Sequence, residues 1–290
     1  MSGNAPAGVG GVIHDIGYQR YTGARLGRGY AARSLWTYSL RTAYGLGRTA
    51  KAKILPLGLF TLACIASVVL VMVNTQSPEP VLSYVGLVAT FSYAATVFAA
   101  IVGPELVSRD LRNKVLALYL SRPIHRSDYA LAKLAALATA VFVLFTGPML
   151  IMFVGMAFNT STGLSGVLDE IGGLLAGLAA AVIHSAVFAA LALPLAALTG
   201  RRMFGTGLIM AVFLLSAPVS GAVRALDDGA LGQLAGLLDP VSLVNGVDRW
   251  LFGEGLVQTG PYGAVYGLAA LALIAAGTAA LLWRYRKVKA

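Results

Sequence analysis

Long apolar runs without a charged side chain alternate along this sequence with shorter segments that carry nearly all the charges. Each of the six runs reaches the roughly 20 residues that a helix needs to cross the hydrocarbon core of a bilayer. We therefore predict an all-α membrane protein with six transmembrane helices, at about residues 54–75, 83–104, 132–156, 171–199, 203–222 and 261–283. These spans form one domain over residues 54–283, between an N-terminal segment at 1–53 and a short tail at 284–290.

The basic residues gather on alternate connections between these spans. Of the 22 Lys and Arg, 20 lie in residues 1–53, in residues 104–133, at positions 201–202 and in the tail from residue 284. The remaining connections hold two basic residues and eight of the twelve acids. Since basic loops are retained in the cytoplasm during insertion, both termini are expected to be cytoplasmic. The excess of Arg over Lys and the abundant Ala and Gly are typical of a GC-rich bacterial genome, so a bacterial plasma membrane is the expected location.

Composition narrows the class of protein further. A chain that is 58% hydrophobic and 12% charged, with a mean hydropathy of +0.77, is far more apolar than a soluble domain. The net charge of +10 lies where anionic lipid headgroups attract basic groups, so membrane lipids are the expected partner and nucleic acid is not. The single cysteine, Cys64, allows no disulfide framework or thiol pair, and we expect no metal site. No early apolar segment resembles a signal peptide.

Residues 30–52 are predicted to form a helix that lies at the membrane surface, after a Gly-rich stretch to which we assign no role. One stripe of this helix is mainly apolar and the side next to it is basic. The stripe holds Trp36, Leu40, Ala43, Tyr44 and Gly47, and the basic side holds Arg33, Arg41 and Arg48. That arrangement suits aromatic rings at headgroup level with guanidinium groups reaching outward. A solvated cytoplasmic helix is the alternative interpretation.

The connection between the second and third spans has helical order of its own. Over residues 105–120, apolar side chains recur at helical spacing, at Val107, Leu111, Val115 and Leu118. Glu105 with Arg109, and Asp110 with Lys114, are spaced as favourable i,i+4 pairs. Pro123 then blocks a helix, and Ser127 or Asp128 is expected to cap the next one. We predict an amphipathic cytoplasmic helix followed by a sharp turn; a solvated charged connector is the alternative.

This loop resembles a known family. Glu105-Leu-Val-Ser-Arg109-Asp-Leu-Arg112, followed by Leu120-Ser-Arg122-Pro123-Ile124-His-Arg126 and Lys133, is similar to the cytoplasmic loop of type 2 ABC exporter permeases. The resemblance implies an N-terminal interfacial helix, six spans, a coupling helix between spans two and three, and a partly re-entrant external segment before span six. It also implies two copies of a separate ATPase subunit and a second permease chain, identical or related. The Gly-rich first thirty residues lie outside the resemblance.

The same resemblance implies which residues meet the ATPase. They are Glu105, Arg109, Leu111, Arg112, Val115, Leu118, Arg122, Pro123 and Arg126. In this view the arginines contact acidic or polar positions on the ATPase, and the apolar side chains pack into its groove. The chain lacks an ATP-binding loop of its own, because residues 45–51 do not have the GxxxxGK[ST] spacing that cradles phosphates. ATP and magnesium are therefore expected in the partner, with no cofactor in this chain.

The segment between the fifth and sixth spans contains two short apolar pieces, at residues 231–238 and 241–252. Asp239, Pro240 and Gly253 interrupt them, and each piece is too short to span a bilayer. We predict short external helices that dip into the outer leaflet, or alternatively an ordinary external cap.

His184, with Ser185 beside it, is the ionisable residue expected at membrane depth. It is either hydrogen-bonded to a neighbouring helix or part of a substrate or proton path. No acid or base is expected securely within a span to pair with it, which weakens a proton-coupled carrier. A rhomboid-type pairing of His184 with Ser165 is disfavoured, because a span that starts near Ile171 puts His184 about 20 Å deeper. No catalytic residue is expected.

The function predicted from the sequence is the permease subunit of an ATP-driven exporter. Aromatic rings in the first three spans favour a lipid-like, amphipathic or drug-like substrate, although such rings also serve plain packing. An ATP-independent carrier, channel or scaffold is the alternative.

Overall fold

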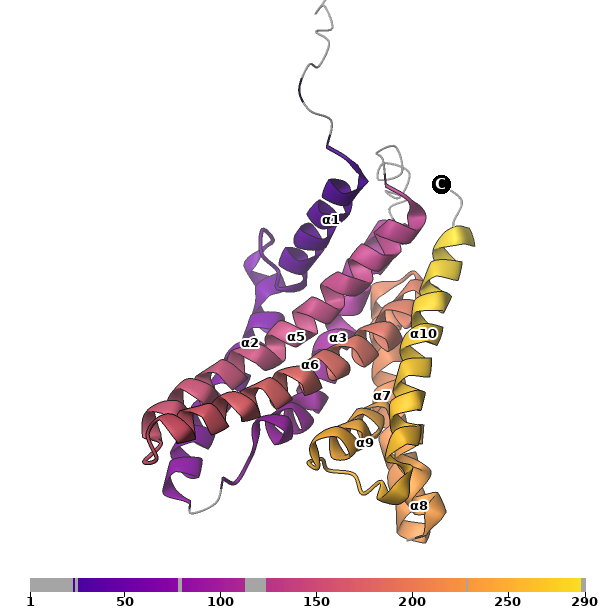
Figure 1. The fold of residues 1–290 in the computed structure, drawn as a ribbon. Coiled ribbons are helices and arrows are strands. Elements are labelled where there is room, and N and C mark those ends of the chain that lie inside the picture. Colours follow the sequence, from indigo (N-terminus) through magenta and orange to yellow (C-terminus); the bar gives the residue numbers. More distant parts are fainter. Residues whose placement is uncertain (1–22, 24–25, 78–79, 113–123, 228, 288–290) are drawn as a thin grey trace, which may run out of the picture.

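The computed structural model describes residues 23, 26–77, 80–112, 124–227 and 229–287, and these are all helical or in short connections. The helices in chain order are α1 (Arg28–Ala43), α2 (Ala50–Gln76), α3 (Tyr84–Arg112), α5 (Arg126–Asn159), α6 (Leu164–Thr199), α7 (Arg202–Leu226), α8 (Ala230–Leu234), η1 (Ala235–Leu238), α9 (Pro240–Phe252), η2 (Gly260–Tyr262) and α10 (Gly263–Lys287) (Figure 1).

Six of these helices, α2, α3, α5, α6, α7 and α10, are long and apolar enough to cross a membrane. The predicted all-α fold is therefore confirmed for the described residues, and the six long apolar helices fit a multi-pass membrane protein.

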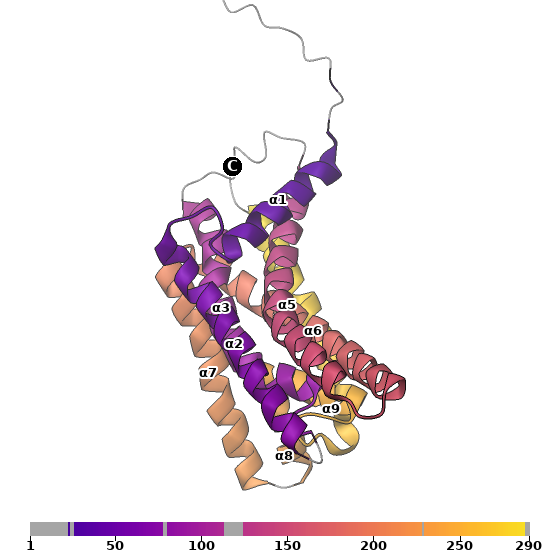
Figure 2. The same ribbon diagram turned by 90° about the vertical axis from the view of Figure 1, so that its left-hand side faces the viewer.

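The six long helices divide into a core and a rim. In the most apolar part of each helix, 61% of the residues of α3 and 50% of those of α6 are buried, against 17% in α2, α7 and α10. Helix α5 is intermediate and runs beside α6 (Figure 1), while α2 and α7 flank α3 (Figure 2). The rim helices present apolar side chains outward, as lipid-facing helices do.

Small residues allow close contact between these helices. A Cβ at Gly277 of α10 would lie 2.0 Å from the carbonyl oxygen of Ala190 on α6, and a Cβ at Gly147 of α5 would lie 2.4 Å from the Phe60 ring of α2. In a membrane the hydrophobic effect does not drive helices together, so close packing at small residues supplies much of the energy of their association.

Helix α3 corrects the predicted end of the second span. It runs without a break through Pro104 to Arg112, whereas a separate helix was expected from residue 105. Pro104 is buried, and Leu106 and Val107 are buried one turn later. The continued burial stabilises the helix beyond a residue that usually interrupts one. Of the predicted loop helix, residues 113–120 lie outside the described part of the chain.

Three other predicted boundaries are wrong. The N-terminal helix ends at Ala43 rather than near 52, because a turn with Gly45 and Gly47 at positive φ separates it from α2. Helix α5 begins at Arg126, and Asp128 lies inside its first turn, where it accepts a hydrogen bond from the backbone N–H of His125. Helix α6 begins at Leu164, seven residues before the predicted start at 171.

Candidate functional site

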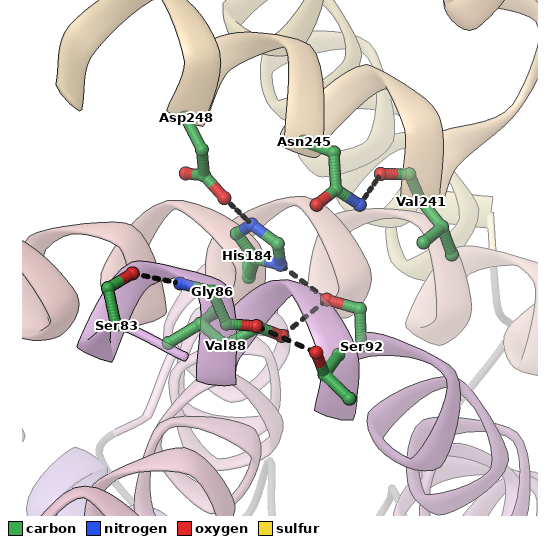
Figure 3. Close-up of polar contacts among 9 residues, drawn as sticks. Ser83, Gly86, Val88, Ser92, His184, Val241, Asn245 and Asp248 are labelled. Atoms are coloured by element: carbon green, nitrogen blue, oxygen red, sulfur yellow. Dashed lines mark hydrogen bonds and ion pairs between the residues drawn. The ribbon is translucent and has the colours of Figure 1, made fainter. Parts of the chain in front are cut away.

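Three fully buried side chains from three different helices form a continuous polar chain at the centre of the molecule. His184 of α6 lies with Nε2 2.7 Å from Oδ2 of Asp248 on α9 and with Nδ1 2.8 Å from Oγ of Ser92 on α3 (Figure 3). All three side chains have no exposed surface. Because hydrogen bonds strengthen in an apolar surrounding, this chain joins α3, α6 and α9 firmly.

Aromatic rings enclose the imidazole. Phe145 and Phe188 meet the ring of His184 edge to face, with centroids 5.9 and 5.8 Å away. These walls help to keep solvent from the imidazole, which has no exposed surface.

Ser92 can either donate or accept in its hydrogen bond with the imidazole. Its Oγ lies 2.9 Å from the carbonyl oxygen of Val88 as well as near His184. When Nδ1 of His184 carries no proton, the Ser92 hydroxyl donates to it. When Nδ1 is protonated, Ser92 accepts that hydrogen bond and donates to Val88 instead. The hydrogen bond between Ser92 and His184 is therefore kept with either tautomer of the ring, whereas Val88 accepts from Ser92 only when Nδ1 is protonated.

Helix α9 brings Asp248 to this position because it is packed inside the bundle. Residues 240, 241 and 243–248 are buried. Asp239 caps the helix by accepting from the backbone N–H of Ser242 at 2.8 Å, and it also accepts from the hydroxyl of Ser216 on α7 at 2.9 Å. Short helices between the fifth and sixth spans were predicted, and α8, η1 and α9 are found there.

Aromatic side chains and glycines fit α9 against α10. Trp250 of α9 covers Gly263 and Gly267 of α10, where a Cβ would lie within 2.4 and 2.7 Å of the indole. Tyr266 of α10 covers Gly246 of α9 in return. This reciprocal packing fixes the rotation of α9 and so the direction in which Asp248 points.

A partner for His184 was sought only within the spans, and the acid that pairs with it was therefore missed. That acid is Asp248, whose place in the sequence is a connection between spans. Asp248 and Asn245 each keep one buried side-chain oxygen without a partner among the described residues. Asn245 donates from Nδ2 to the carbonyl of Val241 at 2.7 Å, which leaves its oxygen free (Figure 3). Ser185 donates to Val182 at 3.0 Å and takes no part in the chain.

The residue types Ser, His and Asp also form catalytic triads, so that arrangement needs a direct test against the geometry. Ser165 lies on the same helix as His184, about 28 Å away along the axis, so the rhomboid-type pair cannot form. Ser92 does reach the imidazole, but it has no exposed surface. A nucleophile must be able to contact its substrate, and Ser92 is buried. In the conformation described, the polar chain of Ser92, His184 and Asp248 therefore serves to connect helices.

A second polar cluster occupies the basic end of the bundle and centres on Glu105 of α3. One carboxylate oxygen lies 2.8 Å from Nη1 of Arg48, in the turn between α1 and α2, and the other contacts Arg202 at the start of α7. Glu105 therefore binds two arginines that are distant in sequence, and helical spacing could not have indicated either.

The last turns of α3 are tied to α5 by a further ion pair. Oδ2 of Asp110 lies 2.9 Å from Nζ of Lys133, whose side chain is only 3% exposed, and it accepts from the hydroxyl of Tyr129 at 2.5 Å. The ring of Tyr285 on α10 lies 5.3 Å from that of Tyr129. Arg126 donates to the carbonyl of Arg286 at 2.9 Å. The start of α5 is thereby joined to α3 and α10.

Helix α1 packs along α5 on the same end. The indole of Trp36 donates to Thr139 at 3.2 Å, and the buried hydroxyl of Tyr44 donates to the carbonyl of Ala140 at 2.8 Å. Burial raises the pKa of Tyr44 well above its usual range. Arg28 contacts Asp128, and this hydrogen bond raises the pKa of Arg28.

The predicted loop residues are only partly within the described chain. Glu105 and Arg126 are bonded as above, and Arg109, Leu111 and Arg112 belong to the last turn of α3. Val115, Leu118, Arg122 and Pro123 lie outside the described residues. No protein-family model matches this chain, and no curated protein matches it.

Proposed function

We propose that this chain is the permease subunit of an ATP-binding-cassette exporter and works with a separate ATPase. The observation that carries the proposal is the double attachment of the connection between α3 and α5. On one side, Glu105 and Asp110 join α3 to α7, to the α1–α2 turn and to α5. On the other side, Arg126 joins the start of α5 to α10. A push on this connection would reach every one of those elements.

In the proposed mechanism, α3 carries the motion inward. Ser92 lies thirteen residues before Glu105 on the same helix, a distance of about 20 Å. A shift of the charged end would therefore move the Ser92 hydroxyl and, through His184 and Asp248, would act on α6 and α9. Interfaces of this kind move as packed bodies, because close-packed helices do not deform smoothly.

The partners follow from the same proposal. Two ATPase subunits bind ATP and magnesium and contact Arg109, Arg112 and the residues that follow in the loop, at the cytoplasmic face. A second permease chain completes the pathway. Helix α1 lies at the cytoplasmic membrane surface, α8 and α9 lie toward the outer leaflet, and both termini are cytoplasmic. The apolar outer faces of the rim helices suit a lipid-like, amphipathic or drug-like substrate.

The test is to search the genes beside this one for an ATP-binding-cassette ATPase, to co-express it with this chain, and to purify through this chain by affinity. We expect a stable complex that hydrolyses ATP. The variant Arg109→Glu/Arg112→Glu should lose the ATPase. The control Arg286→Glu/Lys287→Glu, at the end of α10, makes the same change in charge on the proposed cytoplasmic side and should keep the ATPase. Equal recovery of the ATPase with both variants would contradict the proposal.

A second candidate function is an ATP-independent carrier, which the buried pair of His184 and Asp248 favours. Ionisable groups at membrane depth are typical of proton relays. A chain that purifies alone, and that moves substrate in vesicles only when a pH gradient is imposed, would favour the carrier. A channel or a scaffold has no comparable observation in its support.

A further inference from the structure

The outer face of α1 borders an open groove at the basic end of the molecule. Leu35, Ser39 and Ala43 face inward and are buried, and the opposite face carries Arg33 and Arg41 into the groove. The turn that follows α1 closes its far end at Arg48, and the whole groove measures about 610 Å³. Two exposed tyrosines, Tyr30 and Tyr38, also line it.

A second hollow of about 330 Å³ adjoins this groove and shares Thr42 and Arg48 with it. Its polar side includes Lys51 and Arg202. Its apolar side consists of Leu55, Pro56, Ile101 and Val102, from the first turns of α2 and the last membrane turns of α3. The combined cavity thus has a basic mouth and an apolar floor.

Most of the positive charge here is not used by the protein itself. Among the described residues, five basic side chains and one acid, Glu105, line the two hollows, and Glu105 is already bound by Arg48 and Arg202. Within the described residues, no side-chain hydrogen bond or ion pair engages Arg33, Arg41 or Lys51. These three groups can therefore bind an external anion at little cost to the fold.

The surroundings specify what kind of anion fits. Arginine matches the oxygens of a phosphate with two parallel hydrogen bonds. In the first turns of α2, Ile54, Leu55 and Leu57 are exposed apolar side chains, and Leu55 lines the second hollow. Tyrosines commonly lie at headgroup level, as Tyr30 and Tyr38 are placed to do. A free phosphate would use the charges alone, whereas a phospholipid would also cover the apolar floor.

We propose that these two hollows are a binding site for an anionic phospholipid. Its phosphate lies among Arg33, Arg41 and Arg48, and its acyl chains descend along the first turns of α2. Because Arg48 also binds Glu105, the lipid would rest directly on the charged end of α3. This site requires no ATPase, so its test is independent of the exporter proposal.

The experiment is native mass spectrometry of the purified chain in detergent with equimolar phosphatidylglycerol and phosphatidylcholine. Wild type should retain phosphatidylglycerol preferentially. Each basic group near an anionic headgroup contributes about 1 kcal/mol, which is roughly fivefold in binding. Arg33→Gln/Arg41→Gln should therefore lower the ratio of the two bound lipids by roughly 25-fold, and Lys51→Gln, an independent variant in the second hollow, by about fivefold.

The matched control is Arg286→Gln/Lys287→Gln, which removes two exposed charges from the last turn of α10. It should leave the lipid ratio unchanged. The proposal is overturned by an unchanged ratio in the groove variants, or by an equal fall in the control. It is also overturned if inorganic phosphate displaces the lipid completely, because the site would then belong to a soluble anion.

Discussion

Two regions of α3, one around Ser92 and one around Glu105, differ in how they bind their neighbours. Ser92 belongs to the polar chain with His184 and Asp248, which is wholly buried and packed against phenylalanine rings. At the basic end of α3, Glu105, itself 12% exposed, binds two arginines that reach water, Arg48 at 26% and Arg202 at 60% exposed. Exposed ion pairs contribute little, whereas breaking a buried pair leaves a charge without compensation. The comparison indicates a rigid centre and an adjustable end on one helix.

The largest expected effect comes from breaking the buried chain. His184→Ala leaves the Asp248 carboxylate buried without its partner, and should lower the free energy of unfolding by about 3–5 kcal/mol. Unfolding by a denaturing detergent, followed by circular dichroism, measures this change. Ser185→Ala is the neighbouring control and should cost under about 1 kcal/mol, since Ser185 bonds only within its own helix. Similar losses in the two variants would remove the distinction between centre and end.

A second test uses the pair of Asp110 and Lys133, in which one side chain is buried and the other is partly exposed. Asp110→Asn leaves the ammonium of Lys133, 3% exposed, without its counter-charge, and should cost about 2–3 kcal/mol. Lys133→Met should cost less, because Asp110 is 19% exposed and keeps the hydroxyl of Tyr129. The same unfolding assay compares them. If Lys133→Met were the more damaging change, burial would not govern the strength of these contacts.

The contact between α1 and α5 should give a smaller effect. Tyr44→Phe removes a single buried hydrogen bond to the carbonyl of Ala140 and should cost about 1–2 kcal/mol. Tyr38→Phe, on the exposed face of the same helix, is the control and should leave stability unchanged. A null result for Tyr44→Phe would mean that α1 does not depend on this anchor.

The smallest effect on stability is expected at the charged end itself. Glu105→Gln should lower the free energy of unfolding by less than about 1 kcal/mol, because its arginine partners remain accessible to water. High salt should reduce even this difference. A loss as large as that of His184→Ala would show that both ends of α3 are equally rigid.

The sequence was sufficient for the spans, because charge-free runs and lipid-crossing length are one-dimensional properties. It was also sufficient for short helices before α10, since Pro240 and Gly253 mark the limits of α9. The boundary at Pro104 was missed because burial on both sides of a proline is a tertiary property. The seven extra residues of α6 were missed because two adjacent acids, Asp169 and Glu170, indicate a loop. In the structure Glu170 lies within the helix and accepts a hydrogen bond from the hydroxyl of Tyr84 at 2.5 Å.

The polar chain was only half predictable. His184 was singled out at membrane depth, and its hydrogen bonds to α3 and α9 confirm the first of its two interpretations, whereas the substrate or proton path stays a prediction. Its partner was missed because α9 carries Asp248 back into the bundle through contacts with α10 that no local pattern reveals. A pattern was nevertheless available: Val241, Val244 and Asp248 share one helical face. An acid on the apolar face of a short helix indicates a buried partner, and His184 was the candidate at hand.

The most direct test of transmission through α3 is to measure whether the distance between α9 and α5 depends on nucleotide. Cys64→Ala removes the single cysteine, so spin labels can be placed at Leu251 on α9 and at Phe158 at the end of α5, both exposed. Electron-spin distance measurements on the reconstituted complex would compare the nucleotide-free state with ATP and magnesium. We expect ATP to shift the distance distribution in the complex of the otherwise wild-type chain, and we expect no shift when ATP is added to Arg109→Glu/Arg112→Glu, which should not retain the ATPase. An identical distribution with and without ATP, in a complex that hydrolyses it, would contradict transmission through α3.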